Sequence, residues 1–397
     1  MPAVPFALNW PAKIVFGAGC VAKLGGEARL LGQHALLVTT RDLSALGLTA
    51  RVQASLESAG LRVTRFEEVQ PDPSCVAVDE AGQLARSSGC DLVLGLGGGS
   101  AIDLGKGVAV AATHDGPIWD YVTYTGANAK PVSAATLPVL AIPTTAGTGS
   151  EVTQGAVLDN PAKGMKAALL NPRLYPRVAV VDPELTCTLP PKTTAMTGFD
   201  ALTHGIESFL NVERTNPASE LFALEAVRRV ARHLPRILAD PQDAQARAEL
   251  SWAATCGGLC IALSNASVAH AMALPLGAHR SIPHGLALSR LQPVVLAHTW
   301  RTQPERCARL AQAVRAAQPR SSRATQAEAL ANWTRRFVEE IGLAKLWTTE
   351  GMDDALCAQL TRDVFAYMGR PVSQYRPVFS PEEVHQMFAE ALLAPAQ

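Results

Sequence analysis

Residues 91–112, DLVLGLGGGSAIDLGKGVAVAA, decide the fold of this chain. An aliphatic run typical of a β-strand ends in Gly97-Gly98-Gly99-Ser100, and residues 101–112 are compatible with a helix. Glycines let a backbone turn tightly and approach a ligand, and the start of the next helix offers free N–H groups and a positive dipole end. The segment predicts either a phosphate site or a simple strand-to-helix turn, because a GxGxxG pattern is absent.

Three other short aliphatic runs are bounded by glycine, proline or polar residues in the same way. They are residues 35–39 (ALLVT), 139–142 and 178–181 (VAVV). Short strands that alternate with helical segments are typical of a parallel sheet with helical crossovers. The first half of the chain therefore predicts an α/β domain of the nucleotide-binding type.

A second candidate loop, PTTAGTGSE at residues 143–151, follows the strand predicted at 139–142. Its hydroxyls can bond phosphate or ribose oxygens, although alone it is equally compatible with a Ser/Thr-rich turn. Two such loops at the ends of parallel strands would both face the crevice in which open α/β sheets bind ligands, and together they favour a cofactor site. The hydroxyl-bearing candidates are Thr144, Thr145, Thr148 and Ser150.

The pattern changes after the Leu-Pro-Pro turn at residues 189–191. Residues 218–233 and 326–341 carry apolar side chains at spacings of three and four, as amphipathic helices do. Thr325 and Glu328 have the spacing of a capping box, which predicts the start of the second of these helices. We expect an α/β N-terminal domain over residues 1–190 and an all-helical C-terminal domain over residues 191–397.

The composition argues against several classes of protein. The 397 residues include 35 Lys plus Arg and 35 Asp plus Glu, so no basic excess points to nucleic acid or an acidic membrane surface. No apolar run reaches the roughly 18 to 20 residues of a membrane span, and residues 1–10 lack the pattern of a secretory signal. The eight cysteines show no two-residue spacing, so we expect reduced thiols in a cytoplasmic protein.

Four residues of the second half are candidate metal ligands. Asp200 and His204 are four apart in a helical segment and so share one face, although a surface hydrogen-bonded pair is the alternative. His270 lies in an apolar helical run, where a core histidine is the alternative, and His284 lies in a turn before the next helix. Three imidazoles and one carboxylate suit a borderline divalent metal, but spacing alone does not join the two pairs.

Together these segments resemble the iron-containing (group III) alcohol dehydrogenase family. The matching stretches, in the family's order, are GGGSAIDLGK (97–106), IPTTAGTGSEVT (142–153), VVDPEL (180–185), GFDALTHGIES (198–208) and AHAMALPLGAHRSIPHG (269–285). The resemblance implies a dehydroquinate synthase-like architecture with an N-terminal dinucleotide-binding domain and a helical C-terminal domain. It also implies a metal-dependent, NAD(P)-linked oxidoreductase that interconverts a small alcohol and its aldehyde or ketone by hydride transfer.

Carried over residue by residue, the resemblance implies metal ligands at Asp200, His204, His270 and His284. The implied ion is iron, with zinc as the alternative, and the implied cofactor is NAD or NADP. It implies no catalytic residue beyond the metal ligands, and it implies a homodimer or larger homo-oligomer with a small alcohol or aldehyde as substrate. The implied cofactor-binding residues are Thr40, Arg41, Gly97, Gly98, Gly99, Ser100, Thr144, Thr145, Thr148, Ser150 and Lys166, the last on a loose alignment with Lys163 nearby.

Two positions depart from the family pattern. Leu274 stands where many members carry a second histidine, which leaves the proton route open. Thr40, followed by Arg41, stands where many NAD-preferring members carry an aspartate beside the adenosine ribose. Thr40 is uncharged and Arg41 can pair with a 2′-phosphate, whereas Asp42 is expected to begin the next helix. We therefore expect that NADP is accepted and that NAD is also usable.

Two other classes of function stay open on sequence alone. One is a transhydrogenase or lyase of the same fold that retains and recycles its nicotinamide, although the dehydroquinate synthase motifs match poorly. The other is a non-catalytic binding protein, against which the complete ligand set and both cofactor loops argue. The substrate pocket is expected near Leu274, His279 and Arg280, with Arg280 in solvent, and the sequence does not name the alcohol.

Overall fold

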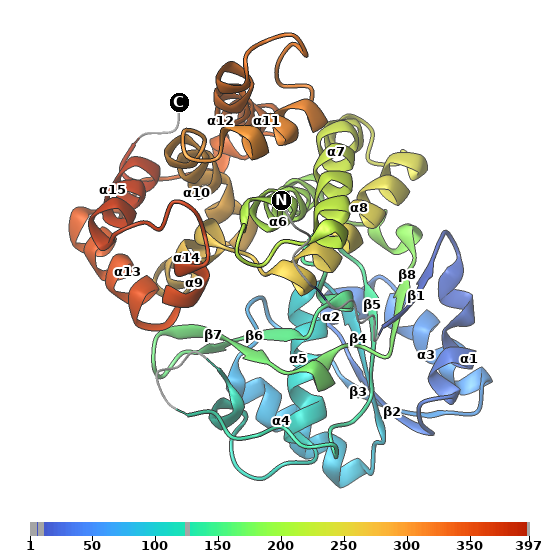
Figure 1. The fold of residues 1–397 in the computed structure, drawn as a ribbon. Coiled ribbons are helices and arrows are strands. Elements are labelled where there is room, and N and C mark those ends of the chain that lie inside the picture. The colour runs from blue at the N-terminus through green and yellow to red at the C-terminus, as the bar shows by residue number, and fades with distance from the viewer. Residues whose placement is uncertain (1–5, 7–11, 124–127, 395–397) are drawn as a thin grey trace. The chain divides into compact units, whose positions relative to one another are not determined.

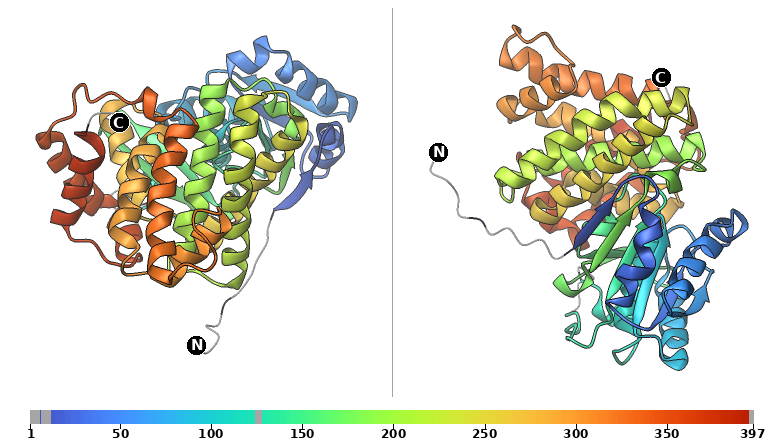
Figure 2. Two further views of the ribbon diagram at one scale, coloured as in Figure 1. Left: turned by 90° about the horizontal axis from the view of Figure 1, so that it is seen from above. Right: turned by 90° about the vertical axis from the view of Figure 1, so that its right-hand side faces the viewer.

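The computed structural model describes residues 6, 12–123 and 128–394. The chain divides into two compact units between Leu189 and Pro190. The first unit is built around a parallel sheet and the second, in its described part, consists of helices (Figures 1 and 2). The predicted fold class, an α/β domain followed by a helical one, is confirmed.

A six-stranded parallel sheet forms the centre of the first unit, in the order β1-β8-β5-β4-β2-β3. The four predicted strands are its inner members, and every residue in them is buried. The two strands that the sequence did not predict, β1 and β3, are the edges; Phe66 is their one buried residue, and β3 mixes polar with apolar residues. The strands are β1 (Lys13–Phe16), β2 (His34–Val38), β3 (Arg62–Phe66), β4 (Leu92–Gly97), β5 (Val139–Pro143) and β8 (Val178–Val181).

Helices cover both faces of this sheet (Figure 1). Side chains alternate along β4, so that Leu94 packs in the same core as Leu24 and Leu56, whereas Val93 packs in the core that contains Val78 and Val108. This double burial explains the continuous apolar runs of the inner strands. The helices are α1 (Leu24–Arg29), α2 (Arg41–Ala45), α3 (Leu48–Ser58), α4 (Cys75–Ser88) and α5 (Gly99–Ala111).

A hairpin that the sequence did not predict follows the second cofactor loop. Its strands, β6 (Gly155–Asn160) and β7 (Met165–Leu170), are antiparallel, and Asp159 lies opposite Lys166. Buried and partly buried residues alternate along β6, as expected for a strand with one face on the core.

Helix α6 (Pro191–Leu210) is almost wholly buried and packs against α7, α8 and α10 in the second unit. Among the described helices none is by itself long and apolar enough to span a membrane, although the bent pair α8 and α9 meets that test jointly. The other helices are α7 (Pro217–Ala239), α8 (Ala244–Ser264), α9 (Val268–Arg280), α10 (His284–Thr299), α11 (Pro304–Ala313), α12 (Arg323–Glu340), α13 (Asp354–Tyr367), α14 (Gly369–Ser373) and α15 (Pro381–Leu392).

The predicted start of α12 is wrong by one turn. Ser322 is the N-cap, and its Oγ accepts the Thr325 N–H at 3.1 Å. The predicted cap, Thr325, therefore lies inside the first turn. Both residues carry a hydroxyl suited to capping, and the sequence pattern did not distinguish them.

Candidate metal centre and cofactor loops

The four candidate metal ligands converge in the helical unit. Asp200 and His204 lie on α6, His270 lies on α9, and His284 is the first residue of α10. The Nε2 atoms of His270, His204 and His284 lie 3.3, 3.5 and 3.7 Å from Oδ1 of Asp200. Asp200, His204 and His270 are buried, whereas one third of the His284 side chain is exposed. The structure thus joins the two pairs that spacing left apart.

A glycine brings the start of α10 against α6. A Cβ atom on Gly285 would lie 2.2 Å from the carbonyl oxygen of Met196, closer than any real contact allows. Only glycine lets the two backbones approach this closely. The contact holds His284, the preceding residue, beside the Asp200 turn of α6.

Asp200, His270 and His284 form a compact group of donors that fits a divalent ion, whereas His204 lies outside this group and approaches Asp200 Oδ1 at 3.5 Å. Bonds of roughly 2.1 Å in a tetrahedral site separate the ligand atoms by about 3.4 Å, close to the three observed separations. The ligand atoms of Asp200, His270 and His284 all lie within 4.8 Å of one another. The rings of His204 and His270 stack with centroids 4.6 Å apart. Imidazole nitrogens with one carboxylate suit iron or zinc rather than magnesium or calcium.

Glu207, which the sequence analysis missed, supports the cluster from behind. Its carboxylate accepts N–H groups from His270 Nδ1 at 2.6 Å, Ser267 N at 2.8 Å and Ala269 N at 2.5 Å. This bond fixes the His270 tautomer that leaves Nε2 free for a metal. Glu207 also caps α9, whose N-cap residue makes no side-chain cap of its own. Its position seven residues after Asp200, on the same face of α6, is the signal that could have found it.

The electrostatics of the cluster favour a bound cation. Burial by itself would raise the pKa of Asp200, but His204, His270 and His284 outweigh burial and hold that pKa well below its usual range. Burial lowers the pKa of His204 to about 4. Burial also opposes protonation of His270, yet Glu207 and Asp200 raise its pKa to about 9. The two buried carboxylates thus require positive charge nearby, which protonated His270 supplies in the metal-free protein and which a divalent ion can supply when it displaces that proton.

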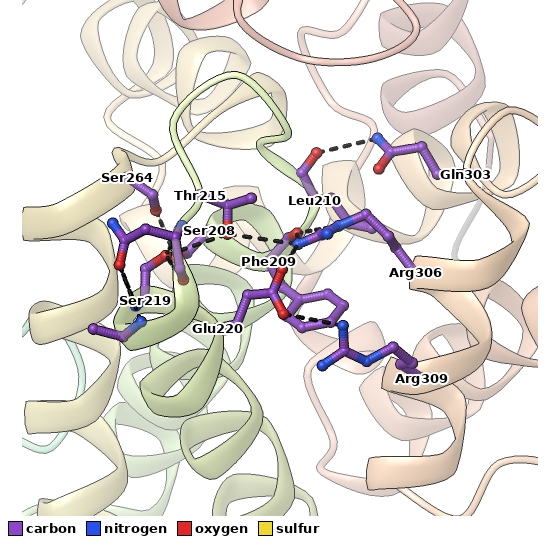
Figure 3. Close-up of polar contacts among 12 residues, drawn as sticks. Ser208, Phe209, Leu210, Thr215, Ser219, Glu220, Ser264, Gln303, Arg306 and Arg309 are labelled. Atoms are coloured by element: carbon purple, nitrogen blue, oxygen red, sulfur yellow. Dashed lines mark hydrogen bonds and ion pairs between the residues drawn. The ribbon is translucent and has the colours of Figure 1, made fainter. Parts of the chain in front are cut away.

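Polar contacts with α7, α8 and α11 fix the C-terminal end of α6 (Figure 3). Ser208 Oγ lies 2.6 Å from Ser264 Oγ on α8. Arg306 Nε of α11 donates to the Phe209 carbonyl at 2.7 Å, and the same guanidinium pairs with Glu220 of α7 at 2.8 Å. The Arg306 bond satisfies a carbonyl that the helix end leaves free, and together the contacts hold the helix that carries two of the candidate ligands.

The two predicted cofactor loops lie against each other at the carboxyl ends of the adjacent strands β4 and β5. A Cβ atom on Gly98 would lie 3.2 Å from the Thr145 methyl group, and one on Gly99 would lie 2.6 Å from the Thr148 methyl group. The Gly98 residue is the N-cap of α5, so the free N–H groups of this helix begin at the glycine loop. The structure therefore brings the two predicted loops together beside a helix N-terminus.

The hydroxyl of Ser150 is engaged inside the protein. It donates to Asp103 Oδ1 at 2.5 Å and accepts from Lys106 Nζ at 2.7 Å. Lys106 is fully buried, which lowers its pKa to about 8, and it also donates to the Gly155 carbonyl at 2.6 Å. This network, missed by the sequence analysis, ties α5 to the start of β6. It leaves only the backbone of Ser150 for a cofactor.

Thr40 and Arg41 also have protein partners. Thr40 Oγ1 caps α2 by accepting the Leu43 N–H at 3.3 Å, so the helix begins at Arg41, one residue before the position expected from Asp42. Arg41 pairs with Glu68 at 2.5 Å, and both side chains are more than half exposed. A carboxylate therefore lies in this region after all, contributed by Glu68.

Lys166 is almost fully buried, and its Nζ lies 2.6 Å from Asp72 Oδ2.

Leu274 is partly exposed one turn after His270. Arg280 is exposed and donates to the Gly351 carbonyl at 3.2 Å, so it lies in solvent as expected.

Comparison with known proteins places both units in one family. Residues 11–183 match the model "Iron-containing alcohol dehydrogenase", and residues 194–392 match "Fe-containing alcohol dehydrogenase family, C-terminal". Long-chain-alcohol dehydrogenase 1 of Geobacillus thermodenitrificans is 36% identical over 89% of this chain and 90% of its own length.

Two solved structures extend this likeness. An archaeal halo-thermophilic alcohol dehydrogenase from a Red Sea brine pool superposes with a TM-score of 0.92 at 31% identity, covering 99% of this chain and all of its own. Sulfoacetaldehyde reductase from Bifidobacterium kashiwanohense, solved in complex with NAD+, has a TM-score of 0.84 at 27% identity, covering 98% and 99%.

The fold, the set of candidate metal donors and the matches to known proteins together define a class, the metal-dependent dehydrogenases that use a nicotinamide dinucleotide. Within that class, the chain belongs to the iron-containing alcohol dehydrogenase family. It is an NAD-linked oxidoreductase of alcohols and aldehydes, and the family implies a divalent metal.

Proposed function

We propose that this enzyme interconverts a small alcohol and its aldehyde or ketone at a divalent ion held by Asp200, His204, His270 and His284. The observation that carries this assignment is the convergence of three imidazole nitrogens within 3.3–3.7 Å of one carboxylate oxygen. Such an ion supplies Lewis-acid stabilisation of negative charge on the substrate oxygen during hydride transfer. The partial exposure of His284 leaves one side of the cluster open to a small molecule.

The residues of the chain prepare this site. Glu207 holds the ring of His270, and burial keeps His204 neutral and able to ligate. Leu274 lies on the same helix face as His270 and offers no proton, so a substrate proton must leave through other groups or water. We propose iron as the resident ion. Zinc binds nitrogen ligands more tightly than ferrous iron and can replace it when available.

The cofactor site is proposed at Gly97, Gly98, Gly99 and Ser100, together with the hydroxyls of Thr144, Thr145 and Thr148 and the backbone of Ser150. We propose that NADP is accepted beside NAD. Arg41 and Glu68 form an exposed pair, which contributes little stability and can open. Arg41 can then turn to a 2′-phosphate, whereas Glu68 can accept a ribose hydroxyl. The side chains of Thr40 and Lys166, held by Leu43 N and Asp72, would need to give up a partner to bind cofactor.

We further propose a cytoplasmic homodimer or larger homo-oligomer without a nucleic-acid partner. The free cysteines and the zero formal net charge support this assignment, and the family suggests the assembly. Light scattering on the purified protein tests the oligomeric state.

A substrate panel tests the proposed activity. The metal-free protein is loaded anaerobically with Fe²⁺ or Zn²⁺ and assayed at 340 nm with primary alcohols, secondary alcohols and aldehydes, each with NAD(H) and NADP(H). We expect reduced cofactor to appear in solution when an alcohol is added. Reduction of tightly bound nicotinamide without its release would instead favour the transhydrogenase or lyase alternative.

A further inference from the structure

A surface groove of about 880 Å³ in the helical unit is lined by several arginines. Its lining residues come from α7, α8 and the end of α11, helices that Figure 1 labels, and none of the candidate metal ligands is among them. We call it the arginine groove. Its five arginines are Arg228, Arg229, Arg232, Arg236 and Arg315.

Carboxylates compensate only part of this charge. Glu225 pairs with Arg228 and, at 2.5 Å, with Arg229, which also contacts Glu249. Asp243 pairs with Arg236 at 2.7 Å. Within the described parts of the chain, no ion pair reaches the remaining two arginines. Five guanidinium groups therefore face three carboxylates.

The groove also contains a buried donor. His233 is 6% exposed, and its Nδ1 accepts from Arg236 at 3.4 Å, so its proton resides on Nε2. Burial and the charges of Arg236, Arg232 and Arg229 lower the pKa of His233, so its ring stays neutral at physiological pH. Gln245 adds an amide N–H donor to the lining, whereas the Gln312 amide donates to Gln326 at 2.7 Å and Glu249 is the one carboxylate among the lining residues. Nearly all of these groups donate hydrogen bonds.

We propose that the arginine groove binds the di- or triphosphate group of a small molecule, at a site distinct from the nicotinamide cofactor. Guanidinium groups bond phosphate oxygens in a bidentate manner, and arginine is the usual residue of phosphate recognition. The volume lies in the range of small-molecule pockets and exceeds the needs of a single phosphate. Inorganic polyphosphate and a nucleoside triphosphate share this chemistry.

An anion bound in the arginine groove would affect α7 and, through it, α6. Four of its arginines lie on α7, which packs directly against α6, the helix that carries Asp200 and His204. An anion that neutralises the surplus charge removes repulsion along α7. Binding therefore raises the midpoint of thermal unfolding, because the ligand favours the folded state.

Calorimetry tests the proposal on the full-length enzyme saturated with NAD, so that the cofactor site is occupied. Tripolyphosphate and adenosine triphosphate are the two probes, titrated without Mg²⁺ at matched ionic strength against sulfate. The groove variant is Arg232→Gln with Arg315→Gln. The control is Arg335→Gln with Arg336→Gln, which removes the same charge from exposed positions on α12.

We expect binding of tripolyphosphate to weaken tenfold or more in the groove variant and less than twofold in the control. Stronger binding of the nucleotide than of tripolyphosphate identifies a nucleotide ligand, and equal binding identifies the phosphate chain alone. The proposal is overturned if the native enzyme prefers neither probe to sulfate, or if both variants weaken binding equally. Loss of binding in Gly98→Val but not in the groove variant also overturns it, since the anion then occupies the glycine loop.

Discussion

Replacing Glu207 by glutamine removes one charge at a point where three N–H groups meet. Oε2 accepts from His270 Nδ1 and Ser267 N, and Oε1 accepts from Ala269 N. An amide has one oxygen, so its NH₂ group must face an N–H group in either orientation. The orientation that opposes fewer donors keeps the oxygen on His270 and turns the NH₂ group toward Ala269.

The magnitudes follow from this geometry. One buried donor without an acceptor costs about 1–3 kcal/mol, so the unfolding free energy of the metal-free protein should fall by that amount. The lost charge acts on the metal, because the ligating His270 loses its anionic partner. Loss of such a partner weakens metal affinity by about 10- to 100-fold, and we expect a change in that range.

Chelator competition measures the Kd for Zn²⁺, and urea unfolding of the metal-free protein measures stability. Ser208→Ala is the matched control, because Ser208 is the next residue on α6, is equally buried, and bonds Ser264 rather than His270. We expect this control to lose stability but keep its metal affinity. Unchanged metal affinity in Glu207→Gln, or equal losses in both variants, would refute the role assigned to Glu207.

Four further predictions, which use five substitutions, probe the proposed sites and the buried Lys106. His284→Ala should abolish metal content and turnover while leaving the unfolding midpoint of the metal-free protein nearly unchanged. The control is His385→Ala, which removes a histidine from an exposed ion pair. A His284→Ala protein that is metal-free yet fully active contradicts the metal site. Gly98→Val should raise KM for the cofactor far more than KM for the alcohol, because the added methyl groups press on Thr145; equal effects would leave the loop a mere turn. Thr40→Asp should shift preference toward NAD by about tenfold, and Glu68→Gln should shift it toward NADP by about two- to fivefold; specificity constants unaffected by either change contradict the ribose assignment. The pKa of Lys106, about 8, lies below the 10.5 of an unperturbed lysine, so between those pH values the unfolded chain binds more protons and the stability contributed by this group rises with pH. Urea unfolding should therefore show that the unfolding free energy of the unsubstituted protein, relative to that of Lys106→Met, increases across this pH range. A constant difference between the two proteins contradicts a buried amine with a lowered pKa.

Prediction from sequence succeeded for the strands whose two faces are both covered by apolar side chains. Every residue of β2, β4, β5 and β8 is buried, and these strands accordingly consist mostly of aliphatic residues. The edge strands β1 and β3 mix charged and apolar residues, and the β7 sequence, MKAALL, is compatible with a helix. These elements depend on neighbours that the local pattern does not contain.

The candidate site divides in the same way. Asp200 and His204 are linked by helical spacing, whereas His270 and His284 joined them only through resemblance and then through tertiary structure. Glu207 was accessible in principle, because it repeats on the same face of α6. By contrast, Glu68 pairs with Arg41, and Asp72 pairs with Lys166, across separate segments of the chain. No local sequence pattern predicts such pairs.

The close approach at Gly285 matters for redesign of this enzyme. Backbone atoms of α6 and α10 are in direct contact there, so the separation of Asp200 and His284 is set by the scaffold rather than by rotamer choice. The substrate pocket is expected near Leu274, so substitutions at that position should change the pocket without moving Asp200 or His284. Directed evolution of substrate range should accumulate substitutions at such positions and leave residue 285 untouched.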